Sequence, residues 1–207
     1  MSLIAKGGIL MVPIVICSVV ALAIIIERLV QIGRVRREND RFLAAIRGRI
    51  RKGNLDEAVA ICKQNTSAPL AVIFLEGLMH IELGEKRTRE AIVEAGERES
   101  TRLERNVGAL ATIAGGAPLL GFLGTVIGMI EAFQKIQELG GNVDASVLAG
   151  GIWQALLTTA AGLTVAVPTY FAHNYILSRV HAEILRMEDH SKGLMLLLTT
   201  GEDRLSS

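Results

Sequence analysis

The sequence predicts an all-α integral membrane protein with three membrane-spanning helices and long helical segments outside the bilayer. Three stretches, 7–26, 107–130 and 145–172, contain no Asp, Glu, Lys or Arg and are 20, 24 and 28 residues long. A helix needs about 20 apolar residues to cross the hydrocarbon core. The chain shows no run of alternating polar and apolar residues, which is the pattern of half-buried strands. An apolar fraction of 50% excludes a disordered chain.

The first element is an N-terminal segment at 1–30 that contains the first span at approximately 7–26. We interpret this span as retained in the mature protein. Its apolar run is longer than the roughly 7–15 residues of a signal peptide, and no small-residue cleavage site follows Ile26. Pro13 lies near the start of the span, where a membrane helix tolerates it.

The second element is a helical region at 31–106 that we expect in the cytoplasm. Residues 27–106 contain 16 of the 22 Lys and Arg residues, whereas the connection between the second and third spans contains only Lys135. Because Lys and Arg concentrate in cytoplasmic loops, the N-terminus and this connection are predicted outside and the C-terminus inside. Glu-before-Arg pairs such as Glu94 and Arg98 favour a solvated helix over a binding patch.

The rest of the chain is predicted to form a second span, an outer loop, a third span and a cytoplasmic C-terminal helix with a tail. These elements are expected at 107–133, 134–144, 145–176 and 177–207. No strong breaker lies between Ile26 and Arg36 or between Ala172 and His190. The first and third spans should therefore continue as long helices outside the membrane.

Small residues are frequent in the second and third spans, which favours close packing inside a bundle of helices. Gly124 and Gly128 form a G-x-x-x-G pair, which alone is weak evidence because glycine is common in membrane helices. Pro118 predicts a kink, since it leaves a backbone carbonyl without its helical partner. The positions expected in helix packing are Gly121, Gly124, Gly128, Gly162, Pro118 and Pro168.

The third span is more polar than a lipid-facing helix, because it contains Gln154, Thr158, Thr159 and Thr164. From residue types alone, packing between helices with threonine hydroxyls bonded to their own backbone is favoured over the lining of a pore. The three charge-free stretches contain no carboxylate. A proton relay through them would need a titrating group from another chain.

Sequence motifs of enzymes and metal sites are missing. The chain has no G-x-x-x-x-G-K-[ST], no H-E-x-x-H and no C-x-x-C. Its four histidines lack the spacing of metal ligands, and Cys17 and Cys62 form no disulfide framework. We therefore expect no enzyme, no catalytic residue, no metal and no cofactor. A net charge of +1 gives no indication of a nucleic-acid partner.

Two long stretches, at 117–133 and 151–163, resemble the MotA/TolQ/ExbB proton channel family, and its ExbB/TolQ branch most closely. They read APLLGFLGTVIGMIEAF and GIWQALLTTAAGL. The order of the spans, the large first cytoplasmic segment and the short outer loop also fit, so the resemblance covers nearly the whole chain. MotA-type stators have four spans, whereas this chain offers three.

The resemblance implies a homopentamer in the bacterial inner membrane that encloses two helices of an ExbD/TolR-like single-span protein. This partner dimer would supply the protonatable Asp. The family's pore threonines fall on Thr125 and Thr159, and the implied pathway also includes Thr158 and Gln154. Many relatives have Glu where this chain has Gln154, which leaves the titration to the partner's Asp.

The implied function is that of a proton-channel or stator subunit, which uses the proton motive force to drive motion of a partner. A TonB- or TolA-like protein would carry the work to outer-membrane import or envelope maintenance. A threonine-rich wall is compatible with protons or sodium, and the family branch favours protons. A non-conducting membrane scaffold that assembles partner helices remains the alternative. A membrane enzyme is disfavoured by the missing motifs.

Overall fold

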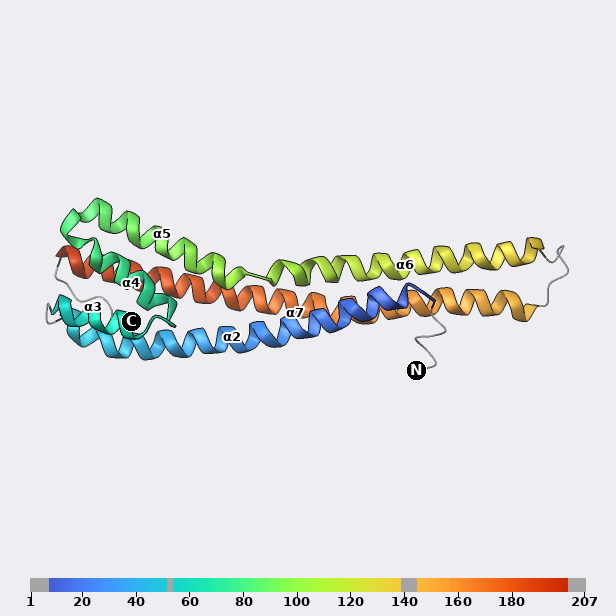
Figure 1. The fold of residues 1–207 in the computed structure, drawn as a ribbon, viewed down its shortest axis with the longest axis horizontal. Coiled ribbons are helices and arrows are strands. Elements are labelled where there is room, and N and C mark those ends of the chain that lie inside the picture. The colour runs from blue at the N-terminus through green and yellow to red at the C-terminus, as the bar shows by residue number, and fades with distance from the viewer. Residues whose placement is uncertain (1–7, 52–53, 139–144, 201–207) are drawn as a thin grey trace. The chain divides into compact units, whose positions relative to one another are not determined.

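The computed structural model describes residues 8–51, 54–138 and 145–200, and every regular element within these ranges is a helix (Figure 1). In chain order the elements are α2 (Met11–Arg51), α3 (Leu55–Gln64), α4 (Pro69–Met79), the 3-10 helix η1 (Ile81–Leu83), α5 (Glu85–Glu104), α6 (Val107–Glu138) and α7 (Ala145–Thr200). The all-α class predicted from the sequence is confirmed for this part of the chain.

Three helical stretches are long and apolar enough to cross a membrane, as the sequence predicts. They lie within Met11–Ile50, Glu85–Glu138 and Ala149–Leu198. The continuation of the first and third spans is also found: α2 runs unbroken to Arg51, and α7 runs unbroken to Thr200.

Helix α6 is longer than the second span predicted from the sequence. It continues to Glu138, so the beginning of the expected loop at 134–144 is helical. The rest of that loop, at 139–144, lies outside the described residues, as do the first residues of the chain. Pro118 and Pro168 lie inside α6 and α7, and neither ends its helix.

The chain divides into two compact units, each formed from two separate stretches. We call them the apolar unit, which comprises Met1–Glu27 and Asn106–Ile176, and the charged unit, which comprises Arg28–Arg105 and Leu177–Ser207. The division at Ile176 coincides with the inner end expected for the third span. The three charge-free stretches therefore belong to the apolar unit.

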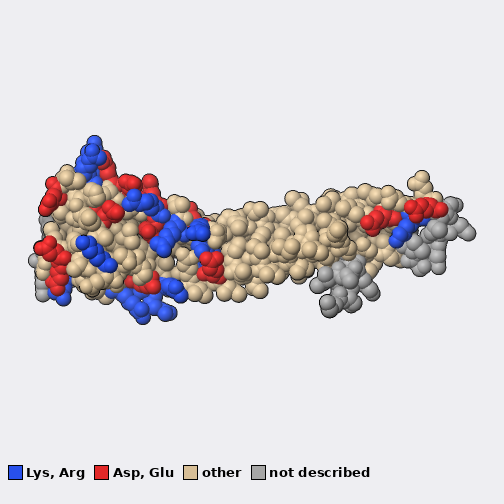
Figure 2. Space-filling view, in the orientation of Figure 1, with Lys and Arg blue, Asp and Glu red and all other residues tan. Residues whose placement is uncertain are grey.

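Large apolar side chains are exposed over the surface of the apolar unit. Leu119, Phe122 and Phe171, for example, are 68%, 64% and 67% exposed. Figure 2 shows this unit almost bare of Lys, Arg, Asp and Glu, apart from one end. Such extensive apolar exposure is typical of a surface that contacts lipid rather than water.

The charged unit has an apolar core beneath a surface rich in both signs of charge (Figure 2). Phe42 of α2 and Phe74 of α4 are fully buried and pack edge to face, with ring centroids 5.4 Å apart. Leu194 of α7 is also fully buried. Burial of each such side chain stabilises the fold by about 1.5–3 kcal/mol.

Helices α5 and α6 are separate because the chain turns at Arg105 and Asn106. Asn106 has a φ of 64°, in the left-handed region that Asn tolerates better than most residues. Arg105 is the C-cap of α5, and its carbonyl accepts a hydrogen bond of 2.9 Å from Nη1 of Arg28 on α2. Arg28 thus satisfies one of the carbonyls that a helix end leaves without an intrahelical donor.

A buried asparagine joins three helices of the charged unit. Asn39 of α2 donates from Nδ2 to Oε1 of Glu183 on α7 at 2.9 Å, and its Oδ1 accepts the backbone N–H of Leu70 in α4 at 3.1 Å. Asn39 and Glu183 are 1% and 5% exposed. Helix α4 begins at Pro69 with no side-chain cap of its own. Asn39 therefore supplies the acceptor that this helix start requires.

Replacement of Asn39 by Ala is expected to lower the free energy of unfolding by about 2–6 kcal/mol. The change leaves a buried carboxylate oxygen and a buried N–H unpaired, and each costs about 1–3 kcal/mol. Thermal unfolding in detergent, followed by circular dichroism, measures the loss. The control is Asp40→Asn, which removes a half-exposed ion pair of 2.7 Å to Arg186, worth about 0–1 kcal/mol. Equal losses in the two variants would contradict the assigned role of Asn39.

Candidate functional site

Helices α6 and α7 approach each other closely along a seam of glycine and alanine. A Cβ placed on Gly162 of α7 would lie 2.5 Å from the carbonyl oxygen of Ala117 and 3.1 Å from the Cα of Gly121, both on α6. A Cβ placed on Gly128 would lie 2.9 Å from the Cβ of Ala155. Because carbon atoms pack at about 3.5–4.0 Å, only a residue without a side chain fits at these points.

The other two glycines expected in helix packing lie at the same seam. A Cβ on Gly124 would lie 2.6 Å from Oγ1 of Thr158, and a Cβ on Gly121 would lie 3.0 Å from the carbonyl oxygen of Thr158. The two prolines differ from the glycines. Pro118 is half-buried and Pro168 is exposed. A packing role for Pro168 therefore requires a second chain.

The seam extends beyond the positions expected from the sequence. A Cβ on Gly151 of α7 would lie 2.7 Å from the Cβ of Ala132 on α6. Ala117 and Ala132 are both buried. The signal in the sequence is a series of small residues three or four positions apart, which share one face of a helix. In α6 this series is Ala117, Gly121, Gly124, Gly128 and Ala132.

Two threonine hydroxyls meet across the seam. Oγ1 of Thr159 on α7 donates to the carbonyl oxygen of Gly121 on α6 at 2.8 Å, and it is also hydrogen-bonded to Oγ1 of Thr125. Oγ1 of Thr125 lies 3.3 Å from the carbonyl oxygen of Ala155 on α7. Both threonines are half-buried. The structure thus brings together the two threonines that the family resemblance selects, and we call them the threonine pair.

The other threonines of these two helices whose side chains are described bond to their own helix. The hydroxyls of four threonines each donate to the carbonyl four residues earlier, namely those of Thr112, Thr158, Thr164 and Thr169. This is the packing arrangement that residue types alone favour. Thr125 and Thr159 differ, because their hydroxyls also bond across to the neighbouring helix.

The side chain of Gln154 approaches the N-terminal part of the described chain. Its amide Nε2 lies beside Gly8, where a Cβ would be 2.9 Å from it. Thr158 is 2% exposed and donates to the carbonyl oxygens of Gln154 and Ala155 at 3.1 and 2.8 Å. Thr158 therefore shares the carbonyl oxygen of Ala155 with Thr125 of the threonine pair, whereas the side chain of Gln154 lies beside Gly8.

The chemistry available at the threonine pair is hydrogen bonding without titration. Each hydroxyl provides one donor and two acceptor positions, so a half-buried pair can bond to water or to a group from another chain. The charge-free stretches 107–130 and 145–172 supply no acid or base around it. Proton transfer at this site would therefore need an acid or base from outside these two stretches.

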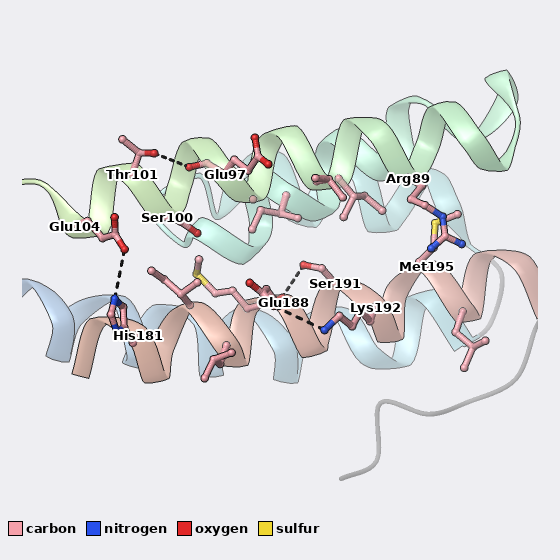
Figure 3. A pocket seen from close by; sticks show the side chains of 18 residues that line it. Arg89, Glu97, Ser100, Thr101, Glu104, His181, Glu188, Ser191, Lys192 and Met195 are labelled. Atoms are coloured by element: carbon pink, nitrogen blue, oxygen red, sulfur yellow. Dashed lines mark hydrogen bonds and ion pairs between the residues drawn. The ribbon is translucent and has the colours of Figure 1, made fainter. Parts of the chain in front are cut away.

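The charged unit contains a groove of about 1140 Å³ between α5 and α7 (Figure 3). Nε2 of His181 on α7 lies 3.7 Å from Oε1 of Glu104 on α5. The hydroxyls of Thr101 and Ser191 donate to carbonyl oxygens of their own helices. Among the described lining residues, no hydroxyl is hydrogen-bonded to His181.

Cys62 is fully buried in α3, and burial raises the pKa of its thiol to about 12. The thiolate is the reactive form of cysteine, so Cys62 is unreactive at neutral pH. Within 8–51, 54–138 and 145–200, no three His, Cys, Asp or Glu side chains are grouped so that they could hold a metal ion.

Comparison with known proteins relates the chain to a family of channels. The profile of the MotA/TolQ/ExbB proton channel family matches residues 65–189. The putative biopolymer transport protein ExbB-like 3 of Synechocystis is 34% identical over 174 residues, which cover 83% of this chain and 82% of the relative.

Two further relatives match shorter parts of the chain. The biopolymer transport protein ExbB of Xanthomonas campestris is 38% identical over 115 residues, which cover 55% of this chain and 43% of the relative. The Tol-Pal system protein TolQ of Haemophilus influenzae is 38% identical over 118 residues, which cover 57% and 46%. The chain thus spans less than half of these two proteins.

The matched range 65–189 contains α6, the part of α7 that forms the seam, and the whole threonine pair. The relatives carry names of transport and Tol-Pal system proteins rather than of enzymes. Together with the three apolar helices, the match identifies the chain as a membrane protein that belongs to the MotA/TolQ/ExbB proton channel family.

Proposed function

We propose that the chain is a proton-channel subunit of an energy-transducing complex of the ExbB–ExbD or TolQ–TolR type. Five copies enclose two helices of an ExbD/TolR-like partner in the inner membrane. Proton flow drives motion of the partner, and a TonB- or TolA-like protein passes the work to the outer membrane. The N-terminus lies in the periplasm, and the charged unit and the C-terminus lie in the cytoplasm.

The observation that carries the proposal is the threonine pair within charge-free walls. Hydroxyls that bond only to their own helix serve packing, whereas the hydroxyls of Thr125 and Thr159 also bond between helices and remain half-buried. Their remaining hydrogen-bonding capacity suits a carboxyl group or a water chain beside the seam. A partner's aspartate supplies the titrating group that the charge-free stretches lack.

An exposed threonine and an exposed proline of α7 also support assembly with other chains. Thr164 and Pro168 are exposed on α7, although they lie within the third span. A polar or small face of a membrane helix is better placed against protein than against lipid. The pentamer with its enclosed partner provides protein surface for such a face.

A non-conducting scaffold is the second candidate, because the glycine seam would serve it equally well. Proton uptake distinguishes the two. The complex, purified with its co-purifying chains, is placed in vesicles that contain a pH-sensitive dye, and a membrane potential is applied. We expect proton entry that stops when the partner's membrane Asp is replaced by Asn. A complex that assembles completely but admits no protons would favour the scaffold.

A further inference from the structure

We propose that arginines at the end of the first span bind anionic phospholipid headgroups where α2 leaves the bilayer. The arginine patch consists of Arg34, Arg36, Arg37 and Arg41, all exposed on α2. None of them forms an ion pair with another described residue of the chain. The patch lies outside residues 65–189, which match the family profile. This proposal requires that α2 is inserted in a membrane, and it does not depend on proton conduction.

The first arginines of the patch lie on α2 near the depth of the headgroup layer. Exposed apolar side chains continue along α2 as far as Leu29 and Val30, which are 43% and 58% exposed. At about 1.5 Å per residue, Arg34 and Arg37 follow Val30 by about 6 and 11 Å along the helix. The headgroup layer extends about 5–8 Å beyond the hydrocarbon core on each side, and arginine side chains reach several ångströms further.

A shallow hollow lies within the patch. It measures about 510 Å³ and is lined by Arg36, Arg37, Arg41 and Asp40, with the small residues Gly33 and Ala44. A Cβ added to Gly33 would meet no atom within 4 Å. The hollow is therefore open, and three guanidinium groups surround it.

The single carboxylate of the hollow is already engaged within the chain. Oδ1 of Asp40 accepts a hydrogen bond of 2.7 Å from Nη2 of Arg186 on α7. The three arginines of the hollow form no ion pair with a described residue of the chain. A guanidinium group binds phosphate oxygens through two parallel N–H donors, which matches the chemistry of an anionic lipid headgroup.

The arginines of α5 show the opposite arrangement. Arg87, Arg89 and Arg98 pair with glutamates of their own helix at 3.2, 2.9 and 2.9 Å. Their charges are paired within the chain, whereas the arginines of the patch form no such ion pair.

In Figure 2, Lys and Arg gather along the lower edge of the charged unit, which α2 occupies in Figure 1. An external anion is therefore the fitting partner for this edge.

Native mass spectrometry of the full chain in detergent tests the proposal. Phosphatidylglycerol and phosphatidylcholine are added separately at equal concentration, and the lipid-bound fraction is measured. We expect a preference for phosphatidylglycerol that falls roughly fivefold for each arginine lost in Arg34→Gln, Arg36→Gln and Arg37→Gln, and about a hundredfold in the triple variant. The corresponding triple Lys variant keeps the charge and is expected to retain most of the preference.

The matched control removes three charges elsewhere on the charged unit, by Arg47→Gln, Lys63→Gln and Lys86→Gln. These residues are exposed on α2, α3 and α5. This variant is expected to keep the preference. A preference that persists in the arginine triple variant, or that the control loses equally, would overturn the proposal. Displacement of the lipid by equimolar inorganic phosphate would also overturn it, in favour of a free anion. Absent proton uptake would count against the proposed channel alone and leave the lipid preference unchanged.

Discussion

Replacement of Thr159 by Val is expected to abolish proton-driven activity while the complex still assembles. Valine has nearly the same shape, but it cannot donate to the carbonyl of Gly121 or bond to Thr125. Valine also cannot donate to the carboxylate of the proposed partner. A hydrogen bond to such a charged group is worth about 1.5–3 kcal/mol, so proton uptake by vesicles should fall roughly 10- to 150-fold. Thr125→Val is expected to give a similar defect.

Thr164→Val is the matched control for this experiment. Thr164 lies on the same helix, is exposed, and donates only to the carbonyl oxygen of Ala160 on its own helix at 2.8 Å. Its loss should leave proton uptake near the wild-type rate. Full uptake in the Thr159 variant would remove the threonine pair from the proton pathway. Size-exclusion chromatography of each variant establishes that assembly is intact.

Replacement of Gly162 by Ala is expected to destabilise the chain by about 1–3 kcal/mol or more. The added methyl group would lie 2.5 Å from the carbonyl oxygen of Ala117, which is a backbone atom and has no rotamer to change. The two helices must therefore separate, which is the usual cost of overpacking. The midpoint of thermal unfolding in detergent measures this loss.

Gly150→Ala provides the comparison on the same helix, because a Cβ there would meet no atom within 4 Å. This variant should unfold at or slightly above the wild-type temperature, since alanine favours helix more than glycine does. If both variants unfolded alike, the close approach at Gly162 would be wrong. Gly162→Ala should also weaken proton uptake, because separation of the helices would part Thr159 from the carbonyl of Gly121.

The helices and spans could be predicted from composition along the chain. Absence of charge over 107–130 and 145–172, and absence of breakers after Ile26 and Ala172, are local properties of the sequence. They predicted the spans and the unbroken helices α2 and α7. The end of α6 at Glu138 was missed, because polar residues such as Gln134 and Lys135 resemble a loop in composition while forming a helix.

The candidate site depends on how two helices are aligned, which no local pattern specifies. Residue types could not distinguish Thr159 from Thr158, its neighbour in sequence, although one bonds across the seam and the other to its own helix. Only the family resemblance selected Thr125 and Thr159. The link between Asn39 and Glu183 was not predicted either, because its partners lie 144 residues apart. Such pairings arise from tertiary packing.

The most direct test of the proposed function is the native mass of the complex, gently extracted from its own membrane, together with the identities of the co-purifying chains. We predict five copies of this chain with two copies of a single-span protein that carries an intramembrane Asp. That composition provides both the enclosing wall and the titrating group. A monomer, or a complex with unrelated chains, would contradict the proposed channel and favour the scaffold.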